Sequence, residues 1–197
     1  MTPHFPLVQA MLGIVLVAEL TLMRSRLSKD TSRTADRGSL RLLMAIIFIS
    51  VGLAWAAGRR FPQARFDVLF GMGPTSTMCA VAAGIAVFVA GLALRWYSMA
   101  YLGRLFTFDV AIAADHQVID TGPYRRIRHP AYTGSLMTFA GIGLCGGNAL
   151  AFGVLLVPIV LAFMRRIVVE EAALAAALGG AYADYMRRTQ RLVPFVY

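Results

Sequence analysis

The sequence of 197 residues has few charged side chains, which make up 15% of its composition. Soluble domains usually carry about 25% charged residues. Hydrophobic residues account for 58% of the chain, and the mean hydropathy is +0.67. A chain this short has too little interior to bury so much apolar surface. We therefore expect lipid, rather than protein, to cover much of it.

The sequence also lacks the short motifs of several large enzyme classes. It has no GxGxxG after a strand, no phosphate-binding Walker loop, no CxxC or HExxH pair and no serine nucleophile elbow. Its two cysteines, Cys79 and Cys145, stand alone in apolar runs, so we expect neither a disulfide framework nor a metal site. The net charge of +9 could suggest nucleic acid. Because the basic residues lie between apolar blocks, membrane topology and anionic lipid are the better interpretation, and no nucleic-acid partner is expected.

Five apolar blocks are present, at about residues 7–23, 42–58, 75–94, 132–146 and 149–164. A membrane span needs about 20 apolar residues, with a range of about 17 to 25. The first three blocks are long enough. The last two are shorter, and only Gly146-Gly147-Asn148 separates them, which predicts a tight helical hairpin. We expect an all-α, polytopic integral membrane bundle of about five transmembrane helices. The predicted single domain, 1–197, has three spans in 1–98 and a catalytic half in 99–197.

The basic residues predict the orientation of this bundle. Sixteen of the 19 lie in 24–41, 95–130 and 165–191, whereas Arg59, Arg60 and Arg65 are alone on the alternate side. Basic residues concentrate in cytoplasmic loops. The pattern therefore predicts five crossings, with the N-terminus outside and the C-terminus in the cytoplasm. A further helix is expected over 167–188, with a break at Gly179-Gly180.

A first polar segment, HQVIDTGPYRRIRHPAY at 116–132, is expected on the cytoplasmic side. For Arg125 and Arg126 we favour an ordinary membrane-interface loop, in which Arg side chains extend toward the headgroups. His129 is different, because a His-Pro pair that opens an apolar helix is costly to bury without a partner. We therefore expect His129 to have one.

The second polar segment is RRIVVEE, in which Arg166 and Glu170 are four residues apart and share one helix face. An exposed ion pair at this spacing would contribute little stability. These charges, however, directly follow an apolar helix, where burying them is expensive. A functional role is therefore favoured: Arg166 suits a carboxylate or phosphate, and Glu170 suits an amino-bearing ligand.

At these two segments the sequence resembles the isoprenylcysteine carboxyl methyltransferase family, together with related phospholipid and small-thiol methyltransferases of membranes. The resemblance covers residues 102–194 and begins with HQVIDTGPYRRIRHPAYTG. It continues with Arg166, Glu170, Glu171 and Leu174, and then with Gly179, Tyr182, Tyr185, Thr189 and Pro194. The two blocks have the order and spacing of the family, so together they are specific.

The resemblance implies an S-adenosylmethionine-dependent methyltransferase built from membrane helices. It assigns catalytic roles to Arg166 and Glu170, with Arg166 facing the methyl acceptor. The cofactor-binding residues that it implies are His116, Gln117, Val118, Ile119, Tyr124, His129, Pro130, Ala131, Tyr132 and Glu170. The acceptor would be a lipophilic or small membrane-associated molecule. The carboxylate of an isoprenylcysteine-like substrate is one candidate, and an amine, a thiol and a lipid headgroup stay open.

Two other functions remain as alternatives. Membrane sterol reductases, which use NADPH, share a string like RHPAYTG, although the pair Glu170-Glu171 and the later Tyr182 and Tyr185 favour the methyltransferase. A non-enzymatic membrane scaffold or lipid-binding protein is the third possibility. The Arg-rich and Ala-rich composition, with no evident targeting signal, is typical of a bacterial inner membrane, and we expect the active site to face the cytoplasm.

Overall fold

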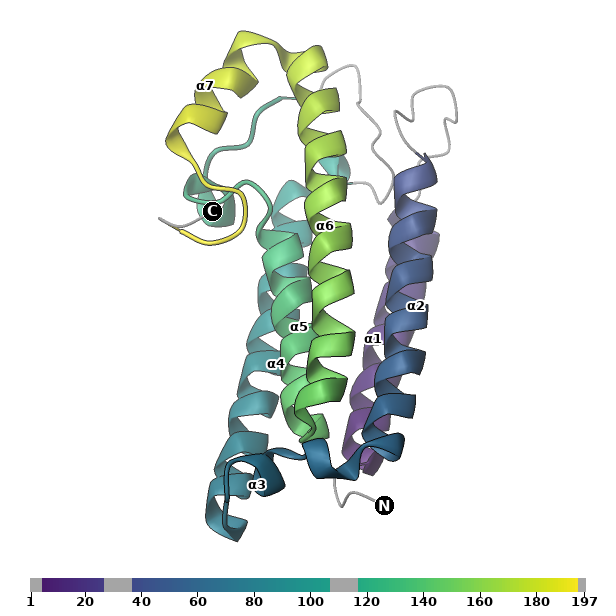
Figure 1. Ribbon diagram of the computed structural model, residues 1–197. Coiled ribbons are helices and arrows are strands. Elements are labelled where there is room, and N and C mark those ends of the chain that lie inside the picture. The colour runs from purple at the N-terminus through teal and green to yellow at the C-terminus, as the bar shows by residue number, and fades with distance from the viewer. Residues whose placement is uncertain (1–4, 27–36, 107–116, 195–197) are drawn as a thin grey trace.

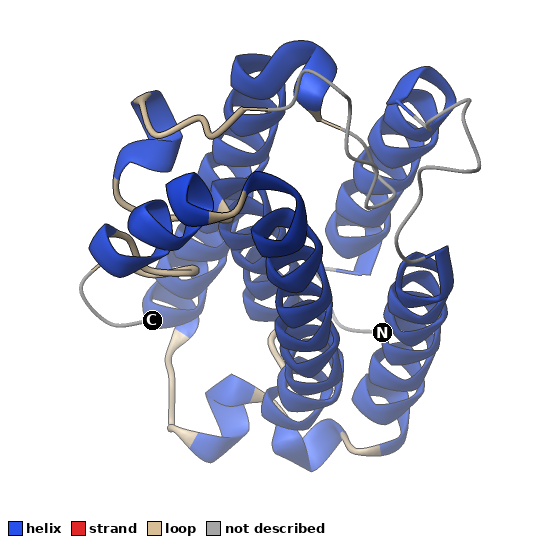
Figure 2. Ribbon diagram, turned by 90° about the horizontal axis from the view of Figure 1, so that it is seen from above, coloured by secondary structure: helices blue, strands red, loops and turns tan. Residues whose placement is uncertain are grey.

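The computed structural model describes residues 5–26, 37–106 and 117–194 and is a bundle of long helices (Figure 1). The long helices are α1 (Phe5–Arg26), α2 (Arg37–Arg60), α4 (Pro74–Leu102), α5 (Pro130–Gly146) and α6 (Ala149–Leu178). Two shorter helices, α3 (Phe66–Leu69) and α7 (Gly180–Arg188), lie at opposite ends of the bundle. Among the described residues there is no β-strand, only isolated bridges (Figure 2). The predicted all-α class is confirmed.

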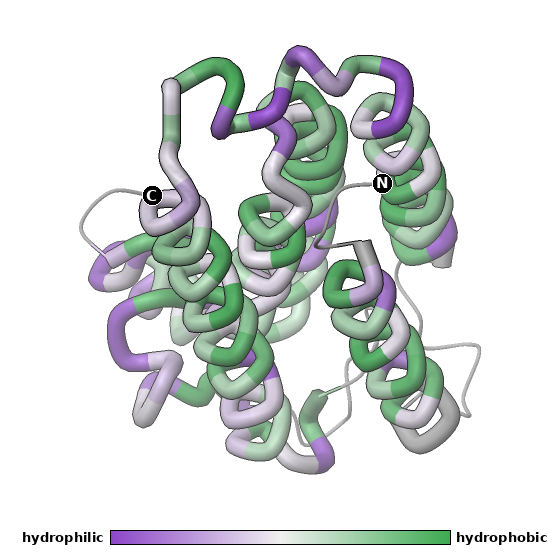
Figure 3. Tube along the Cα trace, turned by 90° about the horizontal axis from the view of Figure 1, so that it is seen from below, coloured by the Kyte–Doolittle hydropathy of each residue, from purple (hydrophilic) through white to green (hydrophobic). Residues whose placement is uncertain are grey.

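Three stretches of the described chain are long and apolar enough to cross a membrane: 38–60 in α2, 74–105 around α4, and 149–178 in α6. The apolar part of α1, Pro6–Leu22, and the 17-residue helix α5 are shorter. Figure 3 shows hydrophobic residues along the helices and hydrophilic ones gathered in the connecting segments. An integral membrane bundle is thus confirmed, while the five crossings and the orientation of the termini stay predictions.

Helix α6 differs from the sequence prediction. We expected an apolar helix at 149–164 and a separate tail helix from 167, but α6 runs without interruption for 30 residues to Leu178. The charged residues after Met164 do not end it, because good helix formers such as Ala and Leu follow them. The helix stops at Gly179, whose φ of 57° favours glycine, so the predicted break there is confirmed. Arg166 and Glu170 therefore stand on the same helix as the apolar span.

Glycines bring α4 and α5 into close contact. A Cβ atom built on Gly134 of α5 would lie 2.6 Å from the backbone nitrogen of Arg95, and one on Gly91 of α4 would lie 2.6 Å from the nitrogen of Thr138. Gly84 of α4 and Gly141 of α5 make similarly close contacts farther along the same two helices. Small residues at membrane helix crossings let backbones approach in this way. The crossing places the C-terminal end of α4 against the first turns of α5.

The hairpin between α5 and α6 is confirmed. Gly147 turns the chain with a φ of 66°, and Asn148 caps α6 by accepting a 2.9 Å hydrogen bond from the backbone nitrogen of Ala151. The Asn148 side-chain nitrogen also donates to the carbonyl of Phe61 at 2.9 Å, which ties the hairpin to the end of α2. At the other end of the bundle, the chain after α7 returns to the start of α5 (Figure 1).

Candidate active site

The segment before α5 and the segment after α7 lie side by side. The backbone nitrogen of Arg128 donates to the carbonyl of Gln190 at 2.7 Å, and that of Gln190 donates to Arg126 at 3.1 Å. The nitrogen of His129 donates to the carbonyl of Arg191 at 3.0 Å. These bonds join the two motif blocks, which are far apart in the sequence. The RHPAY segment is thereby fixed against the C-terminal part of the chain.

Glu171 is the centre of a buried charge cluster in this region. Its Oε1 accepts a 2.7 Å hydrogen bond from Nε of Arg128 and lies 3.3 Å from Nε2 of His129, while its Oε2 accepts from Nε of Arg191 at 2.9 Å. Glu171 is 5% exposed, so these partners replace water around its charge. Arg128 also donates to the carbonyls of Met186 and Thr189. The cluster therefore fastens α6 to the segment before α5 and to the segment after α7.

Tyr132 connects two charged residues of α6. Its hydroxyl donates a 2.6 Å hydrogen bond to Oε2 of Glu170 and accepts a 2.9 Å bond from Nε of Arg166. Arg166 is only 3% exposed, and its Nη1 donates to the hydroxyl of Ser39 on α2 at 2.7 Å. Tyr132 of α5 and Ser39 of α2 thus fix the guanidinium that α6 carries. The four-residue spacing places Arg166 and Glu170 on the same face of α6, so both side chains reach the Tyr132 hydroxyl.

His129 packs directly beside this group. Its ring stacks on that of Tyr132 with centroids 5.5 Å apart and planes tilted by 10°. The expectation that His129 needs a partner is confirmed, since it is buried and contacts Glu171. Pro130 and Ala131 are buried in the first turn of α5. The stack holds the Tyr132 ring at the angle from which its hydroxyl reaches α6.

Tyr124 and Tyr185 brace the loop before α5. The Tyr185 hydroxyl donates a 2.7 Å hydrogen bond to the Tyr124 carbonyl, and the Tyr124 hydroxyl donates to the carbonyl of Ser98 at 3.2 Å. Burial raises the pKa of Tyr185 above its ordinary value, so its hydroxyl stays protonated and remains a donor. Tyr182 is also buried on the same face of α7, as the spacing of these two tyrosines predicts.

The predicted site residues fall into two groups. His129, Tyr132, Arg166 and Glu170 are brought together by direct contacts. The segment Gln117–Ile119 lies outside helices and strands: Gln117 is exposed, and Val118 and Ile119 are half-buried. No described contact links it to the first group. His116 lies outside the described residues.

A cavity of about 370 Å³ adjoins Arg166 and Tyr132. Most of its lining is apolar and comes from α1 and α2, including Val15, Leu43 and Ile47. Its polar lining residues are Glu19, Arg95, Tyr132, Ser135, Thr138 and Arg166. The chamber is therefore amphiphilic, with an apolar body along α1 and α2 and charged groups near the motif segments.

Arg95 and Glu19 form a two-point ion pair on the wall of this cavity. Arg95 donates from Nε to Oε1 of Glu19 at 2.6 Å and from Nη2 to Oε2 at 2.7 Å. Its Nη1 donates to the hydroxyl of Ser135 at 2.8 Å. Because such charges are costly in an apolar setting unless paired, this geometry anchors α1 to α4 and α5.

Sequence reasoning missed five charged residues that build this region: Glu19, Arg95, Arg128, Glu171 and Arg191. Two signals could have found some of them. Glu19 lies inside the first apolar block and Arg95 directly follows the third, and a charge in such a block usually has a buried partner. Glu171 belongs to the quoted Glu-Glu pair, but the sequence does not tell which carboxylate faces inward. The partners of Arg128 and Arg191 depend on the return of the chain after α7, which leaves no local pattern.

Comparison with known proteins agrees with this geometry. The family model described as phospholipid methyltransferase matches residues 79–181, just over half of the chain. The chain belongs to this family. The match begins in α4 and ends at the start of α7, so it includes the RHPAY segment, Arg166 and both glutamates.

Named relatives support the resemblance seen in the motifs. The chain is 33% identical over 118 residues to protein-S-isoprenylcysteine O-methyltransferase B of Arabidopsis thaliana, covering 57% of this chain and 58% of that protein. It is 29% identical over 141 residues to protein-S-isoprenylcysteine O-methyltransferase of Schizosaccharomyces pombe, covering 70% of this chain and 56% of that protein. The matches thus span little more than half the length of these relatives.

A solved structure has the same fold. The eukaryotic intramembrane Ras methyltransferase, an isoprenylcysteine carboxyl methyltransferase, superposes with a TM-score of 0.62 at 23% sequence identity. The superposition covers 78% of this chain and 52% of that one. At this identity the likeness establishes the arrangement of the helices, and the roles of individual residues have to be argued from their contacts.

Proposed function

We propose that the protein is an S-adenosylmethionine-dependent methyltransferase that acts on an amphiphilic acceptor in the membrane. The observation that carries this proposal is the position of Tyr132. Its hydroxyl contacts Glu170, which we assign to the methyl donor, and Arg166, which lines the apolar cavity that we assign to the acceptor. One side chain thus joins the two binding regions. The named relatives, all described as methyltransferases, support the same assignment.

The residues present fit the donor that the family implies. Glu170 is half-buried and offers a second oxygen, because its one described hydrogen bond uses Oε2. A carboxylate in this position suits an ammonium group. The segment Gln117–Ile119, outside regular structure, can offer backbone groups to an adenine or a carboxylate. Bound S-adenosylmethionine would supply an electrophilic methyl group carried by a sulfonium.

Transfer of a methyl group by direct displacement needs no covalent enzyme intermediate. The protein contributes by aligning the two reactants and by removing water between them. The stack of His129 on Tyr132 and the buried cluster around Glu171 hold the donor side rigid. The anchoring of Arg166 by Tyr132 and Ser39 fixes the direction from which an acceptor is oriented. In this proposal Tyr132 positions both charged groups.

The acceptor cavity favours a long apolar molecule with an anionic end. Its lining is mainly aliphatic, and Arg166 supplies a cation on its wall. An isoprenylcysteine-like carboxylate has these properties. It is also the acceptor named in the descriptions of the relatives, which makes it our first choice over an amine, a thiol or a lipid headgroup.

The family and the named relatives are methyltransferases, and they give no support to an NADPH-dependent reductase. The bacterial inner membrane and the cytoplasmic exposure of the site stay predictions from composition and charge. The relatives named above come from eukaryotes and give no support to the former.

The experiment that tests the proposal is methyl transfer by the purified protein in lipid vesicles. Methyl-labelled S-adenosylmethionine would be combined separately with S-farnesylcysteine, with its methyl ester and with phosphatidylethanolamine. We expect label in an ester of the free carboxylate and none with the compound whose carboxylate is blocked. Label in phosphatidylethanolamine alone would indicate that the methyl acceptor is a lipid amine and not a carboxylate. Absence of label in all three, with no binding of the labelled donor, would reject the methyltransferase.

A further inference from the structure

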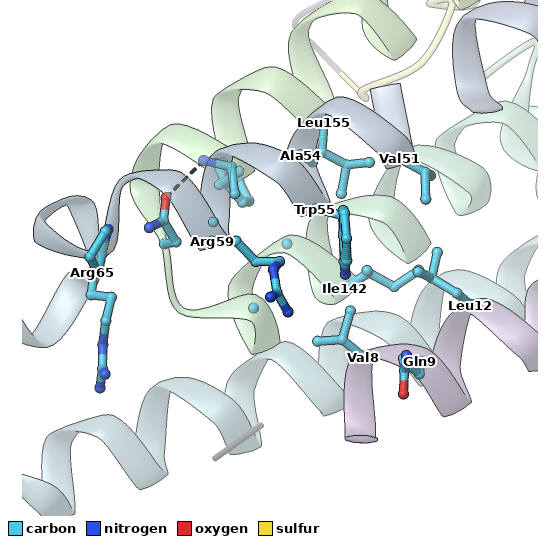
Figure 4. Close-up of a pocket in the computed structure, with 17 residues that line it drawn as sticks. Val8, Gln9, Leu12, Val51, Ala54, Trp55, Arg59, Arg65, Ile142 and Leu155 are labelled. Atoms are coloured by element: carbon cyan, nitrogen blue, oxygen red, sulfur yellow. Dashed lines mark hydrogen bonds between the residues drawn. The ribbon is translucent and has the colours of Figure 1, made fainter. Parts of the chain in front are cut away.

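A second cavity, of about 380 Å³, lies at the end of the bundle opposite the candidate active site. Its wall includes Val8 at the start of α1, Arg59 at the end of α2, and Gly146 and Asn148 in the turn between α5 and α6 (Figure 4). It shares only Leu12 and Val51 with the lining of the acceptor cavity. The two chambers therefore open at different levels of the bundle.

The inner wall of this cavity is apolar. Side chains from four helices line it, among them Leu12, Ala54, Ile142, Phe152 and Leu155. A soluble anion gains nothing from such a wall, whereas a hydrocarbon chain does. The wall therefore favours an amphiphile whose chain lies between α1 and α2.

The rim of the cavity carries a cation without a carboxylate partner among the described residues. The described contact of Arg59 is with the face of the Trp55 ring, 5.1 Å from its centroid, which leaves the guanidinium N–H groups available. Arg65, also on the rim, differs because it donates two hydrogen bonds to Asp67, at 3.0 and 2.6 Å. Figure 4 shows Arg59 near Trp55 and Arg65 farther from both. Arg59 thus supplies the unneutralised positive charge.

These groups lie at the level expected for lipid headgroups. Arg59 is in the last turn of α2, where the membrane-spanning stretch 38–60 ends. Trp55, one turn earlier, is 54% exposed. Tryptophan and arginine are typical of the boundary between hydrocarbon and water. An occupant bound at Arg59 would place its charge at the headgroup level and its chain in the apolar part of the cavity.

We infer that this cavity is a binding site for an anionic phospholipid, with the phosphate at Arg59 and one acyl chain between α1 and α2. The occupant is a bilayer lipid rather than free phosphate, because the wall beyond Arg59 is hydrocarbon. It is anionic rather than zwitterionic because the rim holds positive charge that no described carboxylate offsets. The site is separate from the proposed chemistry, so its test does not depend on methyl transfer.

The test measures lipid retention by native mass spectrometry. The full-length protein would be equilibrated in detergent with dioleoyl phosphatidylglycerol or dioleoyl phosphatidylcholine at equal concentration. We expect one phosphatidylglycerol to be retained preferentially, and Arg59→Gln to weaken its affinity about fivefold, the factor typical of one basic side chain near anionic lipid. The matched control is Arg60→Gln, which removes the same charge from the adjacent residue. Arg60 lies over Phe61 and does not line the cavity.

Two further variants separate the contributions of the charge and of the apolar wall. Arg59→Lys keeps the charge and should retain the lipid, which separates loss of charge from misfolding. Ala54→Leu narrows the apolar wall and should weaken retention of the lipid without any change of charge. Equal effects of the Arg59→Gln and Arg60→Gln variants, or equal retention of the two lipids, would overturn the inference. Competition by millimolar inorganic phosphate as effective as that by added phosphatidylglycerol would assign the site to a free anion instead.

Discussion

Tyr132 at the start of α5 donates a 2.6 Å hydrogen bond to Glu170 on α6, 38 positions later in the chain. The same hydroxyl receives a hydrogen bond from Arg166. The contact explains why a His-Pro-Ala-Tyr segment and an Arg-x3-Glu spacing occur together in one protein. The tyrosine ring is oriented by His129, and its hydroxyl fixes both charged groups of α6.

Replacing Tyr132 by phenylalanine removes the hydroxyl but keeps the ring. Hydrogen bonds to charged groups contribute about 1.5 to 3 kcal/mol, so we expect kcat/KM for methyl transfer to fall roughly 10- to 100-fold. The ring would still stack on His129, so the variant should fold, although loss of the two hydrogen bonds of the hydroxyl should also lower the thermal unfolding temperature. Tyr97→Phe, on an exposed residue of α4, is the control and should be neutral. Wild-type kcat/KM in the Tyr132→Phe variant would remove the hydroxyl from the mechanism.

Glu170 and Glu171 are neighbours, but we expect replacement of Glu171 to affect stability and replacement of Glu170 to affect donor binding. Glu171→Gln leaves Arg128 buried without its carboxylate, and breaking such a pair costs about 3 to 5 kcal/mol, so the unfolding temperature should drop sharply. Glu170→Gln should leave stability nearly unchanged and weaken the binding of S-adenosylmethionine. Thermal unfolding in detergent and titration calorimetry with the donor separate the two effects. The assignments would be reversed if Glu171→Gln bound poorly and Glu170→Gln unfolded.

The α4–α5 crossing predicts that one added methyl group is harmful. Gly134→Ala places a Cβ 2.6 Å from the backbone of α4, and overpacking of this kind costs about 1 to 3 kcal/mol. Gly153 on α6 is the matched control, since a Cβ there would meet nothing within 4 Å. Gly153→Ala should be neutral or slightly stabilising, because alanine is the better helix former. Equal unfolding temperatures for the two variants would contradict the close crossing.

The Glu19–Arg95 pair predicts strong coupling between α1 and α4. Each single change, Glu19→Gln or Arg95→Gln, leaves a charge in apolar surroundings and should destabilise the protein. The double variant should lose less than the sum of the two. A double-mutant cycle on the free energy of unfolding measures this difference. Additive losses would show that the two side chains act independently.

Much of the fold could be predicted from the apolar blocks. The hairpin turn at Gly146-Gly147-Asn148 and the break at Gly179 follow from local residue chemistry, and the structure has both. The continuity of α6 past Arg165 could not be predicted from hydropathy. There the apolar pattern ends, yet helix propensity and the packing of the next two turns against the RHPAY segment keep the backbone helical.

The site was only partly predictable for a related reason. The spacing of Arg166 and Glu170 singles out those two residues, the family resemblance adds His129 and Tyr132, and the structure brings the four together. The spacing does not identify Glu171 as the buried anchor, because that depends on which side of α6 faces Arg128 and Arg191. Such pairings arise from the return of the chain after α7. Tertiary contacts of this kind have no local signature in the sequence.

The measurement that most directly tests the central proposal is kcat/KM for methyl transfer in Tyr132→Phe, in Glu170→Gln and in the variant that carries both changes. Because the hydroxyl and the carboxylate are proposed to act as one unit, the double variant should be no slower than the slower single variant. If the two losses multiplied, or if neither change reduced kcat/KM, the proposed unit of Tyr132 and Glu170 would be contradicted.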